Sequence, residues 1–170
     1  GLWILQECQR EWRAIGGVHD IAALIDLAGS APSTGLVINP DEPQFAQPGG
    51  MVGRITDALR AQDSGIGALS EGEVVRVILE SLAARYARGI ADLSALTGSP
   101  ARQLNLVGGG SRNALLCQLT ADAVGVPVLA GPEEASVLGS LLGQLAIMDT
   151  HDPEDGNAVI AASARTVRYE

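Results

Sequence analysis

Basic residues and long hydrophobic runs are both scarce in this 170-residue chain, and each scarcity excludes a class of protein. Lys and Arg total 11 against 20 Asp and Glu, and the net charge of -9 repels polyphosphate chains. No basic cluster interleaved with aromatic residues occurs, so we expect no nucleic-acid partner. The most apolar stretch, residues 135–148, is interrupted by Ser140 and Gln144 and is shorter than the roughly 20 residues that cross a bilayer. We therefore expect no membrane partner.

Cysteine is equally rare, because Cys8 and Cys117 are the only two in the chain. Cys117 lies among apolar residues at helical spacing, which favours reduced thiols and a cytoplasmic protein over a disulfide. The sequence carries no zinc-binding pattern, and neither His19 nor His151 has neighbours that suggest a metal ligand or a catalytic triad. We predict no metal-ligating residues.

The hydrophobic content of 46% is enough for one soluble domain with a proper core. The chain opens at Gly1, without Met and without a targeting signal, directly into LWILQECQREW. We therefore expect it to be part of a longer protein.

Apolar spacing and capping signals predict several helices in the first hundred residues. Ser70 precedes Glu73 by three residues, the capping-box spacing, and a long apolar pattern follows until Gly98. Between residues 29 and 50, four prolines predict an ordered loop with a short strand at Val37 and Ile38. The predicted helices span residues 2–15, 20–27, 51–60 and 71–98.

The following residues alternate between strand and helix patterns. Strands are predicted over 104–107 and 126–130, and helices over about 112–124 and 133–148. This order is typical of an α/β fold in which a sheet is layered with helices.

Three glycines, Gly108 to Gly110, separate the first predicted strand from its helix. Such a junction places free backbone N–H groups and a helix N-terminus at one point, which favours phosphate binding. The alternative is a tight turn with a packing role only. The dinucleotide pattern G-x-G-x-x-G would need glycine at position 113 and finds Asn113, and the G-K-[ST] end of a phosphate loop does not occur.

The segment VGGGSRNALLCQLTADAVGVPVLAGPEEASVLG, residues 107–139, resembles the adenosine-binding segment of the FGGY carbohydrate kinases. The stretches GLWILQECQREW, INPDEPQFAQPGGMVGRI and GEVVRVILESLAARYARGIADLSALTG resemble the carboxy-terminal half of the L-rhamnulokinase branch of that family. The resemblance implies an actin/hexokinase-like (ribonuclease H-like) lobe over residues 1–150, with 151–170 as its extension.

The resemblance also implies a function, the transfer of the ATP γ-phosphate, with Mg²⁺, to O1 of L-rhamnulose. Gly109 with its neighbours Gly108 and Gly110, then Asn113 and Gln6, are the implied ATP-binding residues. The catalytic base and most sugar contacts are expected in a preceding lobe, so no catalytic residue is assigned here. Without that lobe we expect an inactive chain, with Trp3 and Leu5 at a lobe interface that favours self-association.

Other roles remain open for several of these residues. Gln6 fits an exposed helix position equally well, and Asp122 and Glu134 fit structural positions better than catalytic ones. Trp3 and Trp12 are predicted to pack. Three alternative functions also remain: a sibling FGGY kinase for another ketose or polyol, a non-catalytic ATP-binding module of the actin superfamily, and a dinucleotide-dependent oxidoreductase.

Overall fold

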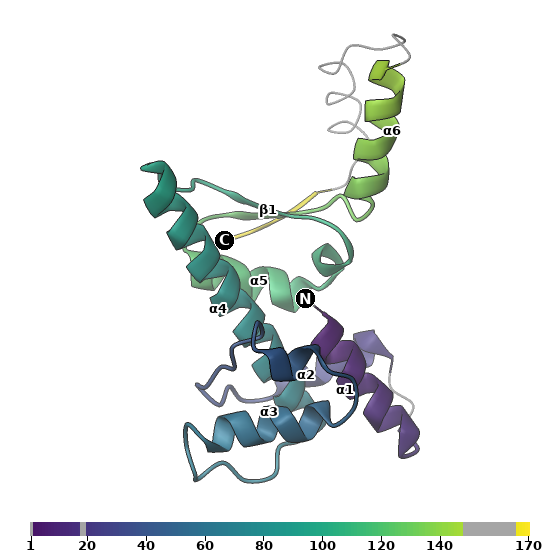
Figure 1. Cartoon of the computed structure of the whole chain (residues 1–170), viewed down its shortest axis with the longest axis vertical. Helices are drawn as coiled ribbons and strands as arrows, with labels where there is room; N and C mark the ends of the chain where they lie inside the picture. The colour runs from purple at the N-terminus through teal and green to yellow at the C-terminus, as the bar shows by residue number, and fades with distance from the viewer. Residues whose placement is uncertain (1, 18–19, 148–165) are drawn as a thin grey trace. The chain divides into compact units, whose positions relative to one another are not determined.

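The computed structural model describes residues 2–17, 20–147 and 166–170, which fall into two compact units, Gly1–Pro100 and Ala101–Glu170 (Figure 1). The boundary proposed near residue 150 lies outside the described residues and stays a prediction. None of the described helices is long and apolar enough to cross a membrane. The elements of the first unit are α1 (Trp3–Ala14), α2 (Ile21–Ser30), the 3₁₀-helix η1 (Pro43–Ala46), α3 (Met51–Arg60) and α4 (Glu71–Thr97).

Helix α4 is the central element of the first unit. Its capping box is formed as predicted: the Glu73 N–H donates to Ser70 Oγ at 3.3 Å, and the Ser70 N–H donates to Glu73 Oε2 at 2.8 Å. Gly98 ends the helix with a φ of 67°. Helices α1, α2 and α3 pack against α4, whose buried residues all lie between Gly72 and Ala83.

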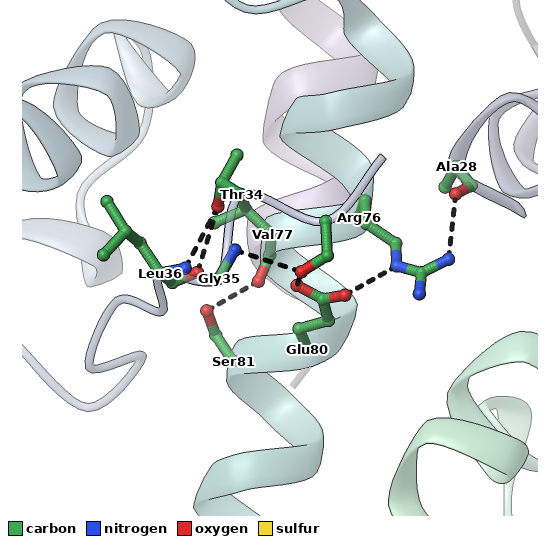
Figure 2. Close-up of polar contacts among 9 residues, drawn as sticks. Ala28, Thr34, Gly35, Leu36, Arg76, Val77, Glu80 and Ser81 are labelled. Carbon is green, nitrogen blue, oxygen red and sulfur yellow. Dashed lines mark hydrogen bonds and ion pairs between the residues drawn. The ribbon is translucent and has the colours of Figure 1, made fainter. Parts of the chain in front are cut away.

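The loop that follows α2 is held on α4 by side chains of the helix (Figure 2). Ser81 Oγ accepts a hydrogen bond from the Ile38 N–H at 2.9 Å and donates to Val77 O at 2.6 Å. Glu80 accepts from Ser33 Oγ at 2.9 Å and from Arg76 Nε at 2.7 Å. The predicted strand at Val37 and Ile38 is wrong, because the Ile38 N–H bonds a helix hydroxyl and these residues stay irregular.

Carboxylates of α1 meet the N-terminal end of α3. Glu11 accepts hydrogen bonds from the N–H groups of Met51 and Val52, and Glu7 accepts one from Gly49 at 3.2 Å. A carboxylate at this position satisfies free N–H groups and complements the helix dipole. The predicted bounds of α3 are confirmed.

Three N-terminal apolar residues were assigned packing or interface roles from the sequence. Trp12 is 6% exposed and packs in the core, as predicted. Leu5 is only 1% exposed, so it belongs to the core of this unit and its expected place at a lobe interface is wrong. Trp3 stays 40% exposed, with the Arg10 guanidinium 5.8 Å from its ring centroid.

The second unit contains a three-stranded sheet in its described part, ordered β1-β2-β3. Strands β1 and β2 are parallel, with Leu106 opposite Ala130, and β3 is antiparallel to β2. Helix α5 packs on β2 and β3. The elements are β1 (Leu104–Leu106), the 3₁₀-helix η2 (Gly109–Arg112), α5 (Ala114–Val124), β2 (Val128–Ala130), α6 (Ala135–Ile147) and β3 (Val167–Tyr169).

The alternation of strand and helix is therefore confirmed, with shorter elements than predicted. Helix α5 begins two residues later than expected, because a 3₁₀ turn intervenes and Asn113 caps the helix. The expected end of the last helix at Met148 lies outside the described residues. Strand β3 was not predicted, since its three largely exposed residues are too short a run for the alternation of Val167, Arg168 and Tyr169 to indicate a strand.

Candidate functional site

The glycine turn, residues 108–112, lies at the carboxyl end of β1, beside the loop that leaves the carboxyl end of β2. Parallel pairing of the two strands brings these ends to one edge of the sheet. The Gly108 N–H donates to Pro132 O at 3.2 Å, and the Gly131 N–H donates to Leu106 O at 2.9 Å. Ligands of α/β sheets bind outside the carboxyl ends of parallel strands, so this edge is the place to examine.

The three glycines differ in why each lacks a side chain. Gly108 has a φ of 78° and a ψ of -166°, a conformation that only glycine adopts readily. At Gly110 an added Cβ would meet Leu106 Cδ2 at 3.5 Å, an ordinary contact. At Gly109 it would meet no atom of the described residues within 4 Å. The backbone is therefore openly accessible above Gly109, and no fold contact requires glycine there.

Two backbone donors in the turn are also available. The Ser111 N–H donates to Gly108 O at 3.0 Å, and the Asn113 N–H donates to Gly110 O at 3.1 Å. The N–H groups of Gly109 and Gly110 donate to no other described residue. Free N–H groups at the start of a helical turn suit an anionic or strongly polar ligand.

Asn113 is the N-cap of α5, directly before its first residue, Ala114. The sequence had placed it inside the first helical turn. Its Oδ1 accepts from the Leu116 N–H at 2.9 Å, so the carbonyl is occupied by the cap. The residue is 3% exposed, and its Nδ2 has no partner among the described residues. A buried amide without a partner is costly, by about 1–3 kcal/mol. Because this nitrogen has no contact with solvent, a ligand group reaches it only if the turn moves.

An ion pair that the sequence did not predict joins the two loops at this edge. Arg112 Nε lies 2.7 Å from Glu133 Oε2, and their side chains are 72% and 46% exposed. The only sequence signal was the presence of opposite charges after each strand. Such a signal is weak because it does not specify the loop geometry.

Comparison with known proteins identifies the family of the chain. Residues 1–148 match the FGGY family of carbohydrate kinases, C-terminal domain. The chain belongs to this family. It is 42% identical over 146 residues to a rhamnulokinase of Pectobacterium carotovorum and 40% identical over 144 residues to one of Bacteroides thetaiotaomicron. Each match covers 85% of this chain, but 28% and 29% of those proteins, so the chain spans less than a third of their length.

The fold of this FGGY domain agrees with a solved relative. The crystal structure of xylulose kinase from Rhodospirillum rubrum superposes with a TM-score of 0.61, covering 97% of this chain and 32% of that one. Its sequence identity is 22%, so the likeness concerns the fold alone. The predicted actin/hexokinase-like α/β architecture is confirmed.

The predicted binding residues of the FGGY domain fall in both units. Gly108, Gly109, Gly110 and Asn113 lie together in the second unit. Gln6 is an exposed residue of α1 in the first unit, so neither unit by itself brings it to the turn. Its role as an ATP contact stays a prediction.

Both cysteines are free, buried thiols, as the sequence indicated. Burial raises the pKa of Cys117, whose Sγ lies 3.9 Å from Gly110 O and 3.7 Å from Ser111 O, directly against the glycine turn. Burial, with the carboxylates of Glu11 and Glu7, raises the pKa of Cys8 to about 12. Neither thiol is therefore ionised near neutral pH, which excludes both as thiolate nucleophiles there.

Proposed function

We propose that the glycine turn of this FGGY domain binds the adenine nucleotide of a kinase that phosphorylates O1 of L-rhamnulose. The observation that carries the proposal is the open backbone above Gly109, with the free N–H groups of Gly109 and Gly110 at the carboxyl edge of β1 and β2. The sugar assignment is supported by the two relatives at about 40% identity, both rhamnulokinases.

Each part of the turn has a distinct role in this proposal. The absent Cβ of Gly109 lets the nucleotide approach the main chain, and the free N–H groups donate to its polar or anionic atoms. Asn113 Oδ1 keeps the helix start in place, and its buried, unpaired Nδ2 becomes a further donor if the turn moves when the nucleotide binds. Gln6 is proposed as a second contact from the first unit.

Mg²⁺ enters this proposal with the substrate, bound to the ATP phosphates. Among the described residues, no group of three His, Cys, Asp or Glu side chains is placed to hold a metal ion. The bound cation would neutralise phosphate charge during transfer. The residues of the turn would hold the nucleotide and position it for the reaction.

The proposed reaction also needs groups that we do not assign to these 170 residues. Phosphoryl transfer requires a residue that accepts the proton of the sugar hydroxyl and donors on the far side of the phosphates. Asp122 is exposed and accepts a hydrogen bond from Gln118 Nε2 at 2.9 Å on its own helix, which gives it a structural role. We therefore propose that the chain by itself binds nucleotide without turnover.

Calorimetric titration of the 170-residue chain with ATP, ADP and NAD tests the nucleotide assignment. We expect ATP and ADP to bind more tightly than NAD, because the turn has Asn113 where the dinucleotide fingerprint needs glycine. ATP binding is expected to be weak, since only one side of the nucleotide is contacted. Tighter binding of NAD than of both ATP and ADP would overturn the assignment.

A sibling FGGY kinase acting on another ketose or polyol would bind its nucleotide in the same way. The nucleotide titration does not separate these two kinases, because sugar contacts are proposed to lie outside this chain. A sugar panel assayed with a complete two-lobe enzyme carrying this domain separates them. A non-catalytic ATP-binding module would show nucleotide binding but no transfer to any sugar in that panel.

A further inference from the structure

The side chain of Arg112 leaves the backbone on the side of the turn where Gly109 has none. Both residues belong to η2, Gly109–Arg112, and residues three apart in a 3₁₀-helix are eclipsed. A side chain added at Gly109 would therefore point in the same direction as that of Arg112. A ligand above Gly109 lies within the range of a long, flexible cation.

The pairing of Arg112 with Glu133 is weak enough to exchange. Their side chains are 72% and 46% exposed, and water screens an exposed ion pair so that it contributes about 0–1 kcal/mol. Two backbone hydrogen bonds, Gly108 N–H to Pro132 O and Gly131 N–H to Leu106 O, already join the loops without it. The ion pair is therefore not needed to hold the turn, and its arginine can leave.

The negative charge of the chain makes a cation at the glycine turn useful for binding a nucleotide. The chain has a net charge of -9, which opposes the approach of a polyanionic nucleotide. A guanidinium binds phosphate oxygens in a forked geometry that a carboxylate partner also fits, so exchange from Glu133 to phosphate conserves the bonding pattern.

We propose that Arg112 is a further nucleotide-binding residue, which exchanges Glu133 for the phosphate chain of the nucleotide held at the glycine turn. This inference rests on the proposed function and extends it to a side chain. It assigns Glu133 the role of a competing partner, which the guanidinium leaves when the nucleotide binds.

The test compares two matched arginines of the second unit by calorimetry on the 170-residue chain. Arg168 Nε lies 2.7 Å from Glu170 Oε1, and these side chains are 55% and 71% exposed, so the control pair matches in chemistry, distance and exposure. We expect Arg112→Gln to weaken ATP binding about tenfold, the effect of losing one charge-assisted hydrogen bond. Arg168→Gln is expected to change it less than twofold.

Two further measurements separate a phosphate contact from a structural role. Adenosine carries no phosphate, so its affinity should be the same in Arg112→Gln and the unaltered chain. Glu133→Gln removes the competing partner, and ATP should then bind equally well or up to about threefold more tightly. Thermal unfolding of all three variants should coincide with that of the unaltered chain, because each lost pair is exposed.

The possible failures are distinguishable. An Arg112→Gln variant that binds ATP like Arg168→Gln would overturn the inference and leave the proposed nucleotide site intact. Equal losses of ATP and adenosine affinity, or weaker ATP binding in Glu133→Gln, would show that the pair braces the turn instead. If the unaltered chain binds no adenine nucleotide, the proposed function fails, and this inference fails with it.

Discussion

Three adjacent glycines illustrate how residues of one type serve different physical needs. Gly108 is required by its backbone conformation, whereas Gly109 has an ordinary φ and open space around the missing Cβ. A side chain at Gly108 would therefore strain the protein, and one at Gly109 would obstruct only what approaches from outside.

Gly109→Val tests this distinction directly. We expect at least a tenfold loss of ATP affinity because the branched side chain occupies the ligand's space, with unfolding free energy changed by less than about 1 kcal/mol. Gly108→Ala is the comparison, expected to lower the unfolding free energy by about 1–3 kcal/mol through backbone strain. Calorimetry and urea unfolding measure the two effects separately. Normal ATP affinity in Gly109→Val would show that the turn is only structural.

Cys8 predicts how the first unit responds to alkaline pH. Its pKa is raised to about 12 in the folded state from an ordinary value of 9.0, so above pH 9 the unfolded chain releases a proton that the folded chain keeps. Stability from this group is complete below pH 9 and is lost as the pH rises toward 12, with a slope of up to about 1.4 kcal/mol per pH unit. Urea unfolding under reducing conditions from pH 8 to 11 measures it. Cys8→Ala, though less stable at pH 7, should show a flatter dependence; an unchanged slope would contradict the assignment.

At the scale of elements, the packing of α2 on α4 depends on one glycine near the start of α4. A Cβ on Gly72 would lie 2.8 Å from Leu27 O and 3.0 Å from Leu27 C, both backbone atoms of α2. Backbone cannot move aside cheaply, so this close approach requires glycine. A Cβ added at Gly89, in the same helix, would lie 3.3 Å from Arg85 Nη1, the end of a flexible side chain.

Alanine substitutions at these two positions should therefore change the free energy of unfolding in opposite directions. Gly72→Ala forces α2 away from α4 and should lower the unfolding free energy by about 1–3 kcal/mol. Gly89→Ala relieves a helix-interior glycine and should raise it by up to about 1 kcal/mol. Thermal or urea unfolding followed by helical circular dichroism measures both. A Gly72→Ala variant as stable as Gly89→Ala would contradict the close approach of α2 to α4 at Gly72.

At the scale of the whole molecule, we propose that this domain by itself binds nucleotide and does not complete the transfer. It spans less than a third of the rhamnulokinases it matches, and we propose that the proton acceptor and the opposing phosphate contacts are supplied elsewhere. Function would then emerge only when both sides of the nucleotide are enclosed.

We expect the purified 170-residue chain to be folded and to release no sugar-dependent ADP from Mg-ATP and L-rhamnulose. Joining it in one polypeptide to the amino-terminal lobe of a rhamnulokinase should produce the activity. A coupled ADP-release assay measures turnover, and light scattering measures the self-association proposed for its exposed apolar groups, including Trp3. Sustained sugar-dependent ADP release from the chain alone, with contaminating kinase excluded, would require a catalytic base here. The first candidates would be Asp122, Glu134 and Asp152, the last of which lies outside the described residues.

The sequence by itself determined the features that depend on neighbouring residues. Ser70 and Glu73 close their capping box across three positions, and Gly98 ends α4 at the predicted place, because caps and left-handed stops need only local chain. The site of the glycine turn after β1 was predictable for the same reason, and the family segment around it was distinctive enough to indicate the kinase fold.

Tertiary structure alone decided the features in which distant residues meet. Ser81 takes the Ile38 N–H that a strand would have used, and burial of Leu5 removes it from any interface. Only the folded chain shows that the positive φ falls at Gly108 and not at Gly109. Arg112 meets Glu133 because the parallel pairing of β1 and β2 brings the loops that follow them to one edge. Spacing along a chain encodes caps and periodicity, but it does not encode which backbone groups and charges become neighbours when strands pair and helices pack.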